Sequence, residues 1–117
     1  RVHEAFPFTR HAVEEQIAVR SLDEVAGELF LKTPILLKAD VQGYELNVLI
    51  GAEKTLPLVD ILILETSFVE LYEGQPLFDE VYQFLHDRRF SYSGSFGQIL
   101  DPSKGVVLQE DSIFVRR

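Results

Sequence analysis

Two acidic side chains, each placed behind an apolar run, are the residues in this sequence best suited to chemistry. Asp40 follows Ile35-Leu36-Leu37-Lys38-Ala39, and Glu65 directly follows Ile61-Leu62-Ile63-Leu64. A carboxylate behind a buried strand must be solvated at the sheet edge or paired. A carboxylate at such an edge can position a hydroxyl group or accept its proton. We therefore take Asp40 and Glu65 as candidate catalytic residues, with a purely structural role for each as the alternative.

A turn motif, Asp40-Val41-Gln42-Gly43, separates the first apolar run from a helical pattern. As a functional loop it would bring a carboxylate and an amide to a ligand, while Gly43 lets the backbone turn closely. Alternatively, Asp40 caps the next helix and Gly43 serves only the turn. Glu45 falls in the first helical turn, where the helix dipole alone accounts for a carboxylate. Tyr72 precedes a later helix, where it walls a pocket or lies half-buried beside a turn.

A strand-helix-strand-helix core should position these side chains. The continuous apolar runs at 35–39 and 61–64 are typical of parallel strands buried on both faces. Apolar residues at helical spacing predict one helix after Gly43 that closes at Pro57, and a second helix that starts at Pro76. A right-handed crossover brings the carboxyl ends of both strands to one edge of the sheet. Ligands of open α/β sheets bind at that edge.

The flanking segments are expected to add smaller elements. Residues 17–20 are a strand candidate, and the spacing of Ser21 and Glu24 predicts the start of a helix over 22–30. Strand-like residues around 90–96 and 112–115, separated by turn chemistry, predict an antiparallel pair. We divide the chain into a lead-in segment, 1–16, and one folded unit, 17–117.

Composition narrows the class of protein further. The 117 residues suit one domain, and 11 Lys and Arg against 19 Asp and Glu give a net charge of −8, which disfavours nucleic acid. No apolar run is long enough to span a bilayer, and cysteine is absent. We expect a cytoplasmic protein without a membrane partner. The three histidines are too dispersed for a metal site, and no phosphate-binding glycine motif is present.

Several blocks, taken together and in order, resemble the FkbM-type methyltransferases over about Ile17 to Val115. The blocks are Leu22-Asp23-Glu24, Leu37 to Glu45, Leu49-Ile50-Gly51-Ala52-Glu53, Leu64-Glu65, Leu71 to Pro76 and Asp111 to Val115. The resemblance implies the C-terminal half of a class I, Rossmann-like α/β fold. It also implies S-adenosylmethionine as cofactor and methyl transfer to a hydroxyl oxygen. The family's glycine-rich cofactor loop and ribose-binding acid should precede these blocks and do not occur in this sequence.

Carried over by position, the resemblance places Asp40 at the end of the fourth strand, beside the methyl-transfer centre, and Glu65 at the end of the fifth. Asp40 is then the first candidate for positioning the acceptor or taking its proton. The implied cofactor-binding residues are Asp40, Val41 and Gln42. The implied acceptor-binding residues are Gln42, Gly43, Glu45 and Tyr72.

The sequence therefore predicts a fragment of an O-methyltransferase for a small-molecule or sugar hydroxyl, inactive alone because the cofactor loop is absent. One alternative is a non-catalytic α/β interaction module. Another is a magnesium-type site formed by Asp40, Glu45 and Glu65. In the implied fold the strand at 35–39 lacks one neighbour and presents an unpaired apolar edge. We expect self-association through that edge, or its coverage by residues 1–16.

Overall fold

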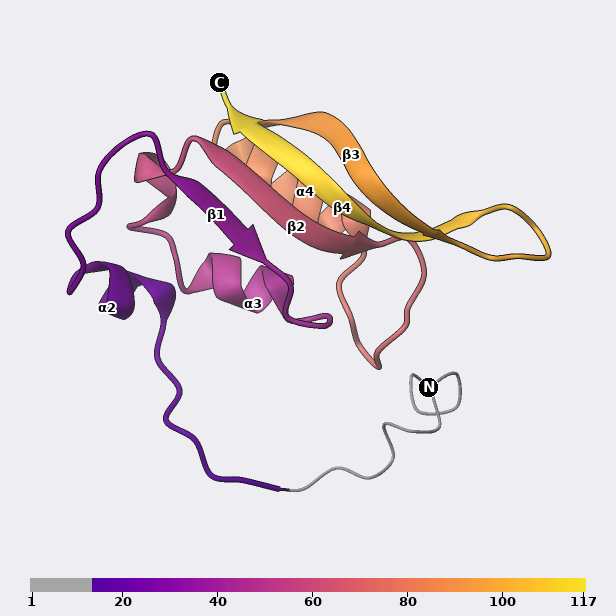
Figure 1. Ribbon diagram of the computed structural model, residues 1–117, viewed down its shortest axis with the longest axis horizontal. Coiled ribbons are helices and arrows are strands. Elements are labelled where there is room, and N and C mark those ends of the chain that lie inside the picture. Colours follow the sequence, from indigo (N-terminus) through magenta and orange to yellow (C-terminus); the bar gives the residue numbers. More distant parts are fainter. Residues whose placement is uncertain (1–13) are drawn as a thin grey trace.

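The computed structural model describes residues 14–117 as a mixed α/β arrangement around one four-stranded sheet of order β1-β2-β4-β3 (Figure 1). The elements, in chain order, are α2 (Leu22–Ala26), β1 (Leu36–Ala39), α3 (Glu45–Ile50), the 3-10 helix η2 (Leu56–Leu58), β2 (Ile61–Ser67), α4 (Phe78–Asp87), β3 (Phe90–Leu100) and β4 (Val107–Arg116). No helix among these residues is long and apolar enough to cross a membrane.

The pairing of the strands follows the predicted pattern. β1 and β2 are parallel, with Ala39 opposite Leu64. β4 is antiparallel to β2 on one side and to β3 on the other. The strand-helix-strand core and the C-terminal antiparallel pair are therefore confirmed. Both strands of that pair are longer than predicted. β1 lies at the edge of the sheet, in agreement with the unpaired edge expected for the strand at 35–39.

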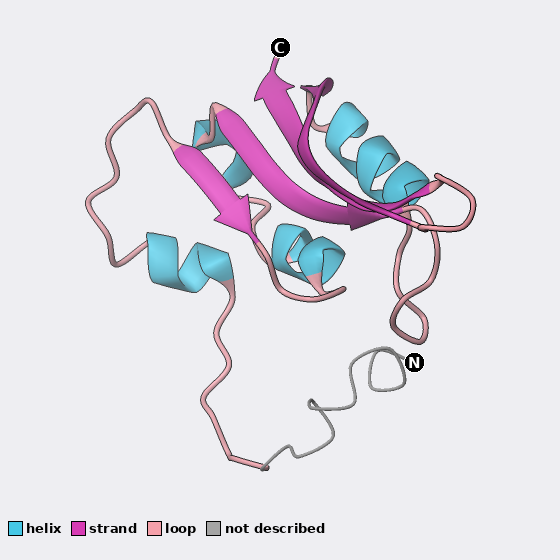
Figure 2. Ribbon diagram, turned by 45° about the vertical axis from the view of Figure 1, so that its right-hand side comes forward, coloured by secondary structure: helices cyan, strands magenta, loops and turns pink. Residues whose placement is uncertain are grey.

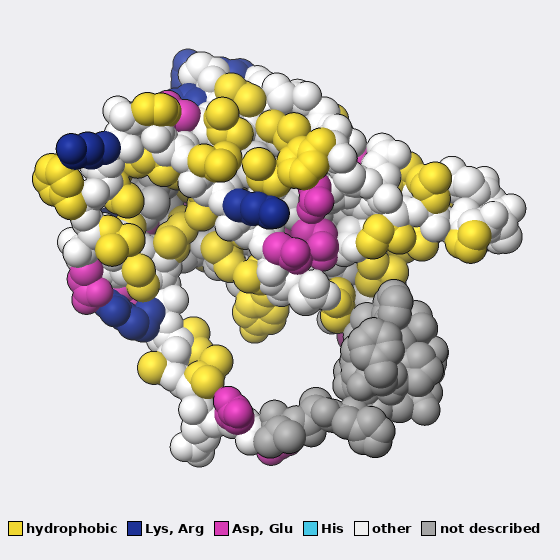
Figure 3. Space-filling view, in the orientation of Figure 1, with side chains coloured by type: hydrophobic (Ala, Val, Ile, Leu, Met, Phe, Trp, Pro, Cys, Tyr) yellow, Lys and Arg dark blue, Asp and Glu magenta, His cyan; other side chains and the backbone are white. Residues whose placement is uncertain are grey.

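The helices cover one face of the sheet and leave the other open. Leu62 and Leu64 of β2 and Phe114 of β4 are fully buried, in one cluster with Leu49 of α3 and Leu85 of α4. Figures 1 and 2 show α4 packed behind the strands, on this covered face. The opposite face is lined by residues that alternate with the buried ones, and Figure 3 shows apolar side chains gathered there. We call this the open face.

One row of paired residues illustrates how exposed the open face is. Leu36 of β1 lies opposite Ile61 of β2, which in turn lies opposite Val115 of β4. Leu36 is 58% exposed and Ile61 is 39% exposed, so the prediction that both parallel strands are buried on both faces is wrong. Among residues 14–117, β1 also has no neighbouring strand on its outer side. A row of unpaired backbone groups beside exposed apolar side chains is a template for pairing with another chain.

The predicted strand at 17–20 is absent, because these residues pair with no strand in the described part of the chain, 14–117; they are exposed. The predicted helix start at Ser21 is confirmed, since the Ser21 side chain accepts a hydrogen bond from the Glu24 amide at 3.2 Å. This helix ends at Ala26, well before Phe30, with Gly27, a poor helix former, as its C-cap.

The other two helices also differ from their predicted bounds. The helix after Gly43 ends at Ile50, because Gly51 caps it and the chain continues through turns into η2. Gly51 lies close to the start of α2, since a Cβ atom there would lie 3.3 Å from the Cβ atom of Ser21, the N-cap of that helix. Pro76 precedes α4 instead of starting it, since Leu77 is the N-cap.

The buried aromatic of β4 gives a test of this core. We expect Phe114→Leu to lower the free energy of unfolding by about 1–2 kcal/mol, because Phe114 is 0% exposed and the smaller side chain leaves a cavity. Phe96→Leu is the matched control, because Phe96 of β3 is 59% exposed and should lose little. Urea unfolding of both variants checks the difference, and equal losses would contradict the assigned core.

Candidate functional site

Three carboxylates meet at the carboxyl end of the parallel strands. Asp40 directly follows β1, Glu65 lies in β2, and Glu45 is the first residue of α3. Carboxylate oxygens of all three lie within 4.8 Å of one another. The prediction that Asp40 and Glu65 share one edge is thus confirmed. Glu65 does not end its strand, however, because β2 continues through Ser67 by pairing with β4.

Glu45 holds the loop between β1 and α3 in place. It is only 4% exposed. One of its oxygens, Oε2, accepts from the Val41 amide at 2.8 Å, and Oε1 accepts from the Gly43 amide at 3.0 Å. Gln42 and Gly43 both take positive φ values, 54° and 94°, which turn those amides toward the carboxylate. The helix dipole alone therefore does not account for Glu45.

Tyr72 and Gln42 connect this loop to Asp40. The Tyr72 hydroxyl donates to the Gln42 side-chain oxygen, and the Gln42 amide lies 3.4 Å from Asp40 Oδ1. A Cβ atom at Gly43 would lie 3.0 Å from a Tyr72 ring carbon, so the glycine permits this packing. The residues predicted to bind an acceptor therefore lie in one neighbourhood with Asp40.

Gln75, which sequence reasoning missed, fixes the segment that carries Tyr72. Its side-chain oxygen accepts from the amides of Leu71 at 3.0 Å and Tyr72 at 3.2 Å. Its side-chain nitrogen donates to Ser67 Oγ at the end of β2, at 2.8 Å. The loop after β2 is therefore tied to the same edge of the sheet as Glu65.

Glu65 has the most perturbed environment of the carboxylates at this edge. Burial raises its pKa to about 7, and the nearby charges of Asp40, Glu45 and Asp111 raise it as well. Gln109 of β4 donates a hydrogen bond to Glu65 Oε1 at 2.7 Å. Within residues 14–117, no Lys or Arg lies within ion-pair distance of Glu65.

The arrangement can hold and move one proton near neutral pH. Burial and the Asp40 charge raise the pKa of Glu65, and carboxylate oxygens of the two residues lie within 4.8 Å of each other. Two carboxylates this close favour sharing a proton over full ionisation of both. Burial and the same carboxylates raise the pKa of Tyr72, which keeps its hydroxyl a donor. Such a pair can accept the proton of a hydroxyl group placed beside it.

The same carboxylates are close enough together for one cation. Hard cations such as Mg²⁺ take about six oxygen ligands. Both Glu45 oxygens already accept from backbone amides, which leaves chiefly Asp40 and Glu65 as free ligands. The described residues thus offer a weak donor set for a metal.

Two further residues at this edge, Gln109 and Asp111 of β4, were not predicted. Asp111 lies directly opposite Glu65, and Gln109 lies opposite Ser67. The sequence placed residues 112–115 in a strand, but nothing in it fixes the register of that strand against β2. That register brings both side chains to Glu65.

Comparison with known proteins identifies the family. A family model described as "Methyltransferase FkbM domain" matches residues 2–92. The chain therefore belongs to the FkbM methyltransferase domain family.

A curated relative supports the same assignment. The chain is 36% identical over 78 residues to the 2-O-methyltransferase NoeI of Sinorhizobium fredii (strain NBRC 101917 / NGR234). The aligned part is 58% of this chain and 32% of the relative, so the chain spans about a third of that protein's length. No solved structure matches the chain.

The raised pKa of Glu65 makes the stability of the protein depend on pH. Its folded-state pKa of about 7 exceeds the ordinary value of 4.5, so its contribution to stability is lost as pH rises from about 4.5 through 7. We expect Glu65→Gln to gain stability relative to the unsubstituted chain between pH 5 and pH 8. After allowance for solvent screening, the gain should be on the order of 1 kcal/mol. Urea unfolding at both pH values measures it.

Asp101→Asn is the control for this measurement. Hydrogen bonds from Ser103 lower the pKa of Asp101 from 3.8, so Asp101 titrates below the tested range. Its effect on stability should be the same at pH 5 and pH 8. A Glu65→Gln effect that is equally constant would contradict the raised pKa.

Proposed function

We propose that this chain is the catalytic-edge part of an S-adenosylmethionine-dependent O-methyltransferase with a Rossmann-like class I fold. Family membership and the name of the relative support methyl transfer to oxygen. The observation that carries the proposal is the Asp40 and Glu65 pair at the carboxyl ends of neighbouring parallel strands. Ligands of open α/β sheets bind at this position. The acceptor is a small-molecule or sugar hydroxyl, and the absence of cysteine suits a cytoplasmic enzyme.

The chemistry asks little of the protein beyond alignment and proton removal. S-adenosylmethionine, when bound, supplies the methyl group. Asp40, Val41 and Gln42 are the residues that would face it, because they form the exposed loop at the end of β1. The carboxylates of Asp40 and Glu65 orient the acceptor hydroxyl and take its proton as the new carbon–oxygen bond forms. The products are a methyl ether and S-adenosylhomocysteine.

We further propose that the chain alone does not turn over substrate. The glycine-rich loop that the family resemblance implies is not among its residues. Within the described residues, β1 has no strand on its outer side, and Leu36 and Ile61 on the open face are exposed. The same two observations favour the second candidate function, a non-catalytic α/β interaction module.

Cofactor binding separates these two functions. By isothermal titration with S-adenosylhomocysteine, we expect the chain to bind the cofactor product weakly, without methyl transfer. Asp40→Asn should reduce the heat of binding, because it removes a carboxylate from the loop that would face the cofactor. Asp79→Asn, an exposed carboxylate on α4, is the matched control and should bind as the unsubstituted chain does. No binding by the unsubstituted chain would favour the interaction module.

The edge of β1 leads to a proposal about assembly, namely that two copies of the chain pair there. Coverage of the edge by residues 1–16 lies largely outside the described residues, and residues 14–16 are exposed. We expect sedimentation equilibrium to show a concentration-dependent dimer. Leu36→Glu should weaken it at least tenfold by placing a charge at the edge. Leu58→Glu, an exposed site in η2, should leave it unchanged. A monomer at all concentrations would contradict pairing.

A further inference from the structure

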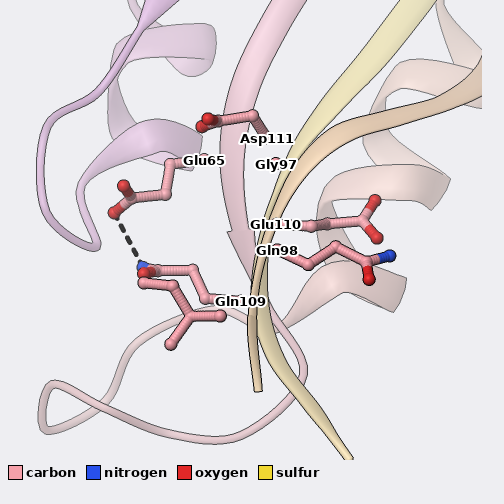
Figure 4. A pocket seen from close by; sticks show the side chains of 7 residues that line it. Glu65, Gly97, Gln98, Gln109, Glu110 and Asp111 are labelled. Atoms are coloured by element: carbon pink, nitrogen blue, oxygen red, sulfur yellow. Dashed lines mark hydrogen bonds between the residues drawn. The ribbon is translucent and has the colours of Figure 1, made fainter.

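A hollow of about 230 Å³ lies beside Glu65, where β2, β4 and β3 meet. Figure 4 shows Glu65, Gln109 and Asp111 projecting to one side of the sheet, while Gln98 and Glu110 project to the side of α4. The polar side chains available to a ligand in this hollow are thus two carboxyl groups and one amide. Ile99 supplies an apolar wall.

Irregular pairing in the hairpin opens this hollow. The register of β3 against β4 shifts between Tyr92 and Ser95, between Ser95 and Gln98, and again after Ile99. Such bulges bend a strand and re-aim its side chains. Gly97 adds space opposite Asp111, because a Cβ atom there would lie 3.2 Å from Asp111 Oδ2. The space beside Glu65 is therefore built into the hairpin.

Gln109 points to a ligand that donates hydrogen bonds. This side chain is only 7% exposed, and its nitrogen donates to Glu65 Oε1 at 2.7 Å. In this bond the amide nitrogen faces Glu65, which leaves the Gln109 side-chain oxygen for another partner. The Gln109 side-chain oxygen accepts no hydrogen bond from any residue in the described part of the chain. No buried side-chain oxygen among the described residues lacks a partner, so the Gln109 side-chain oxygen reaches the surface, where it can accept a hydrogen bond from a ligand.

The negative charges around the hollow also favour a ligand that donates hydrogen bonds. Glu65 and Asp111 lie directly opposite each other on antiparallel strands, an arrangement in which like charges destabilise a sheet. Within residues 14–117, neither carboxylate has a Lys or Arg within ion-pair distance. Asp111 also accepts no side-chain hydrogen bond there. A ligand with several donor groups would relieve this repulsion.

We propose that this hollow binds a sugar-type diol of the methyl acceptor. Two neighbouring hydroxyl groups donate to the Gln109 side-chain oxygen and to the Asp111 carboxylate, and the apolar face of the ring packs against Ile99. The volume lies below the roughly 300 Å³ at which pockets for drug-sized ligands begin, so it suits one sugar unit. A simple ammonium ion would use the carboxylates but not the apolar wall.

This inference rests on the proposed methyl transfer to a hydroxyl, because it places the acceptor's ring next to Glu65. It adds Gln109 and Asp111 as acceptor-binding residues and Gly97 as the residue that leaves room for the ring. Charge-assisted hydrogen bonds from hydroxyl groups to Asp111 should be about twice as strong as neutral ones. Asp111 is therefore the residue whose charge the ligand should sense most.

NMR titration of the full chain with methyl α-D-glucopyranoside and methyl α-D-mannopyranoside tests the proposal. We expect saturable shifts of the Gln109 side-chain amide and of the Gly97 and Asp111 backbone amides with at least one glycoside. Asp111→Asn should weaken binding about tenfold. It should not unfold the chain, because it removes a like-charge contact with Glu65. Asp79→Asn, on α4, should bind as the unsubstituted chain does.

The other outcomes overturn the proposal. The first is that neither glycoside causes shifts at the hollow. The second is that Asp111→Asn binds a glycoside as well as the unsubstituted chain does. The third is that methylammonium chloride causes the shifts and the glycosides do not, which would indicate a cation site. Titration with S-adenosylhomocysteine keeps this test separate from the proposed function. Glycoside shifts without cofactor binding would retain the sugar site and remove support for methyl transfer, and cofactor binding without glycoside shifts would do the reverse.

Discussion

The hydrogen-bonded register of β2 with its two neighbours is the constraint on which the candidate site depends. Ala39 lies opposite Leu64, so the next residues along the two parallel strands, Asp40 and Glu65, emerge side by side. On the other side of β2, the antiparallel register places Asp111 opposite Glu65. These carboxylates cannot separate without loss of backbone pairing. The sheet therefore imposes their mutual repulsion, which adds to the effect of burial in raising the pKa of Glu65.

The carboxylates of this edge receive different numbers of hydrogen bonds from neighbouring amides, and this difference gives each one a different role. Glu45 receives two backbone amides from its own loop and acts as a structural anchor. Glu65 receives one amide, from Gln109, and keeps a pKa raised to about 7. Asp111 receives no side-chain donor among the described residues. Glu45, which anchors its loop, Glu65, which can share a proton, and Asp111, which has no side-chain donor among the described residues, thus lie close together.

Local sequence patterns predicted the elements that depend on interactions between residues near each other in the chain. The apolar runs gave both parallel strands, and the spacing of Ser21 and Glu24 gave a helix start. The position of Asp40 and Glu65 at one edge followed from the crossover rule. Element ends were less predictable, because glycine caps such as Gly27 compete with apolar periodicity.

The roles of Gln109 and Asp111 could not be predicted, because they arise from pairing between strands more than 40 residues apart, as the hydrogen bond from Gln109 to Glu65 shows. Residue spacing within one strand says which side chains share a face, but not which neighbours they meet. The bulges of β3 add to the difficulty, since each register shift changes the partner of every later residue.

The open face couples assembly to the chemistry of the site. Ile61 and Glu65 lie four residues apart on β2 and point to the same face, as do Val115 and Asp111 on β4. A structure that covered this face along β2 from Ile61 to Glu65 would also remove water from the carboxylates. Burial is already the largest cause of the raised pKa of Glu65, so coverage would raise it further and strengthen Glu65 as a proton acceptor. Because alternate residues of β2 point to the same face, covering the apolar side chains of that face would also affect the strength of Glu65 as a base.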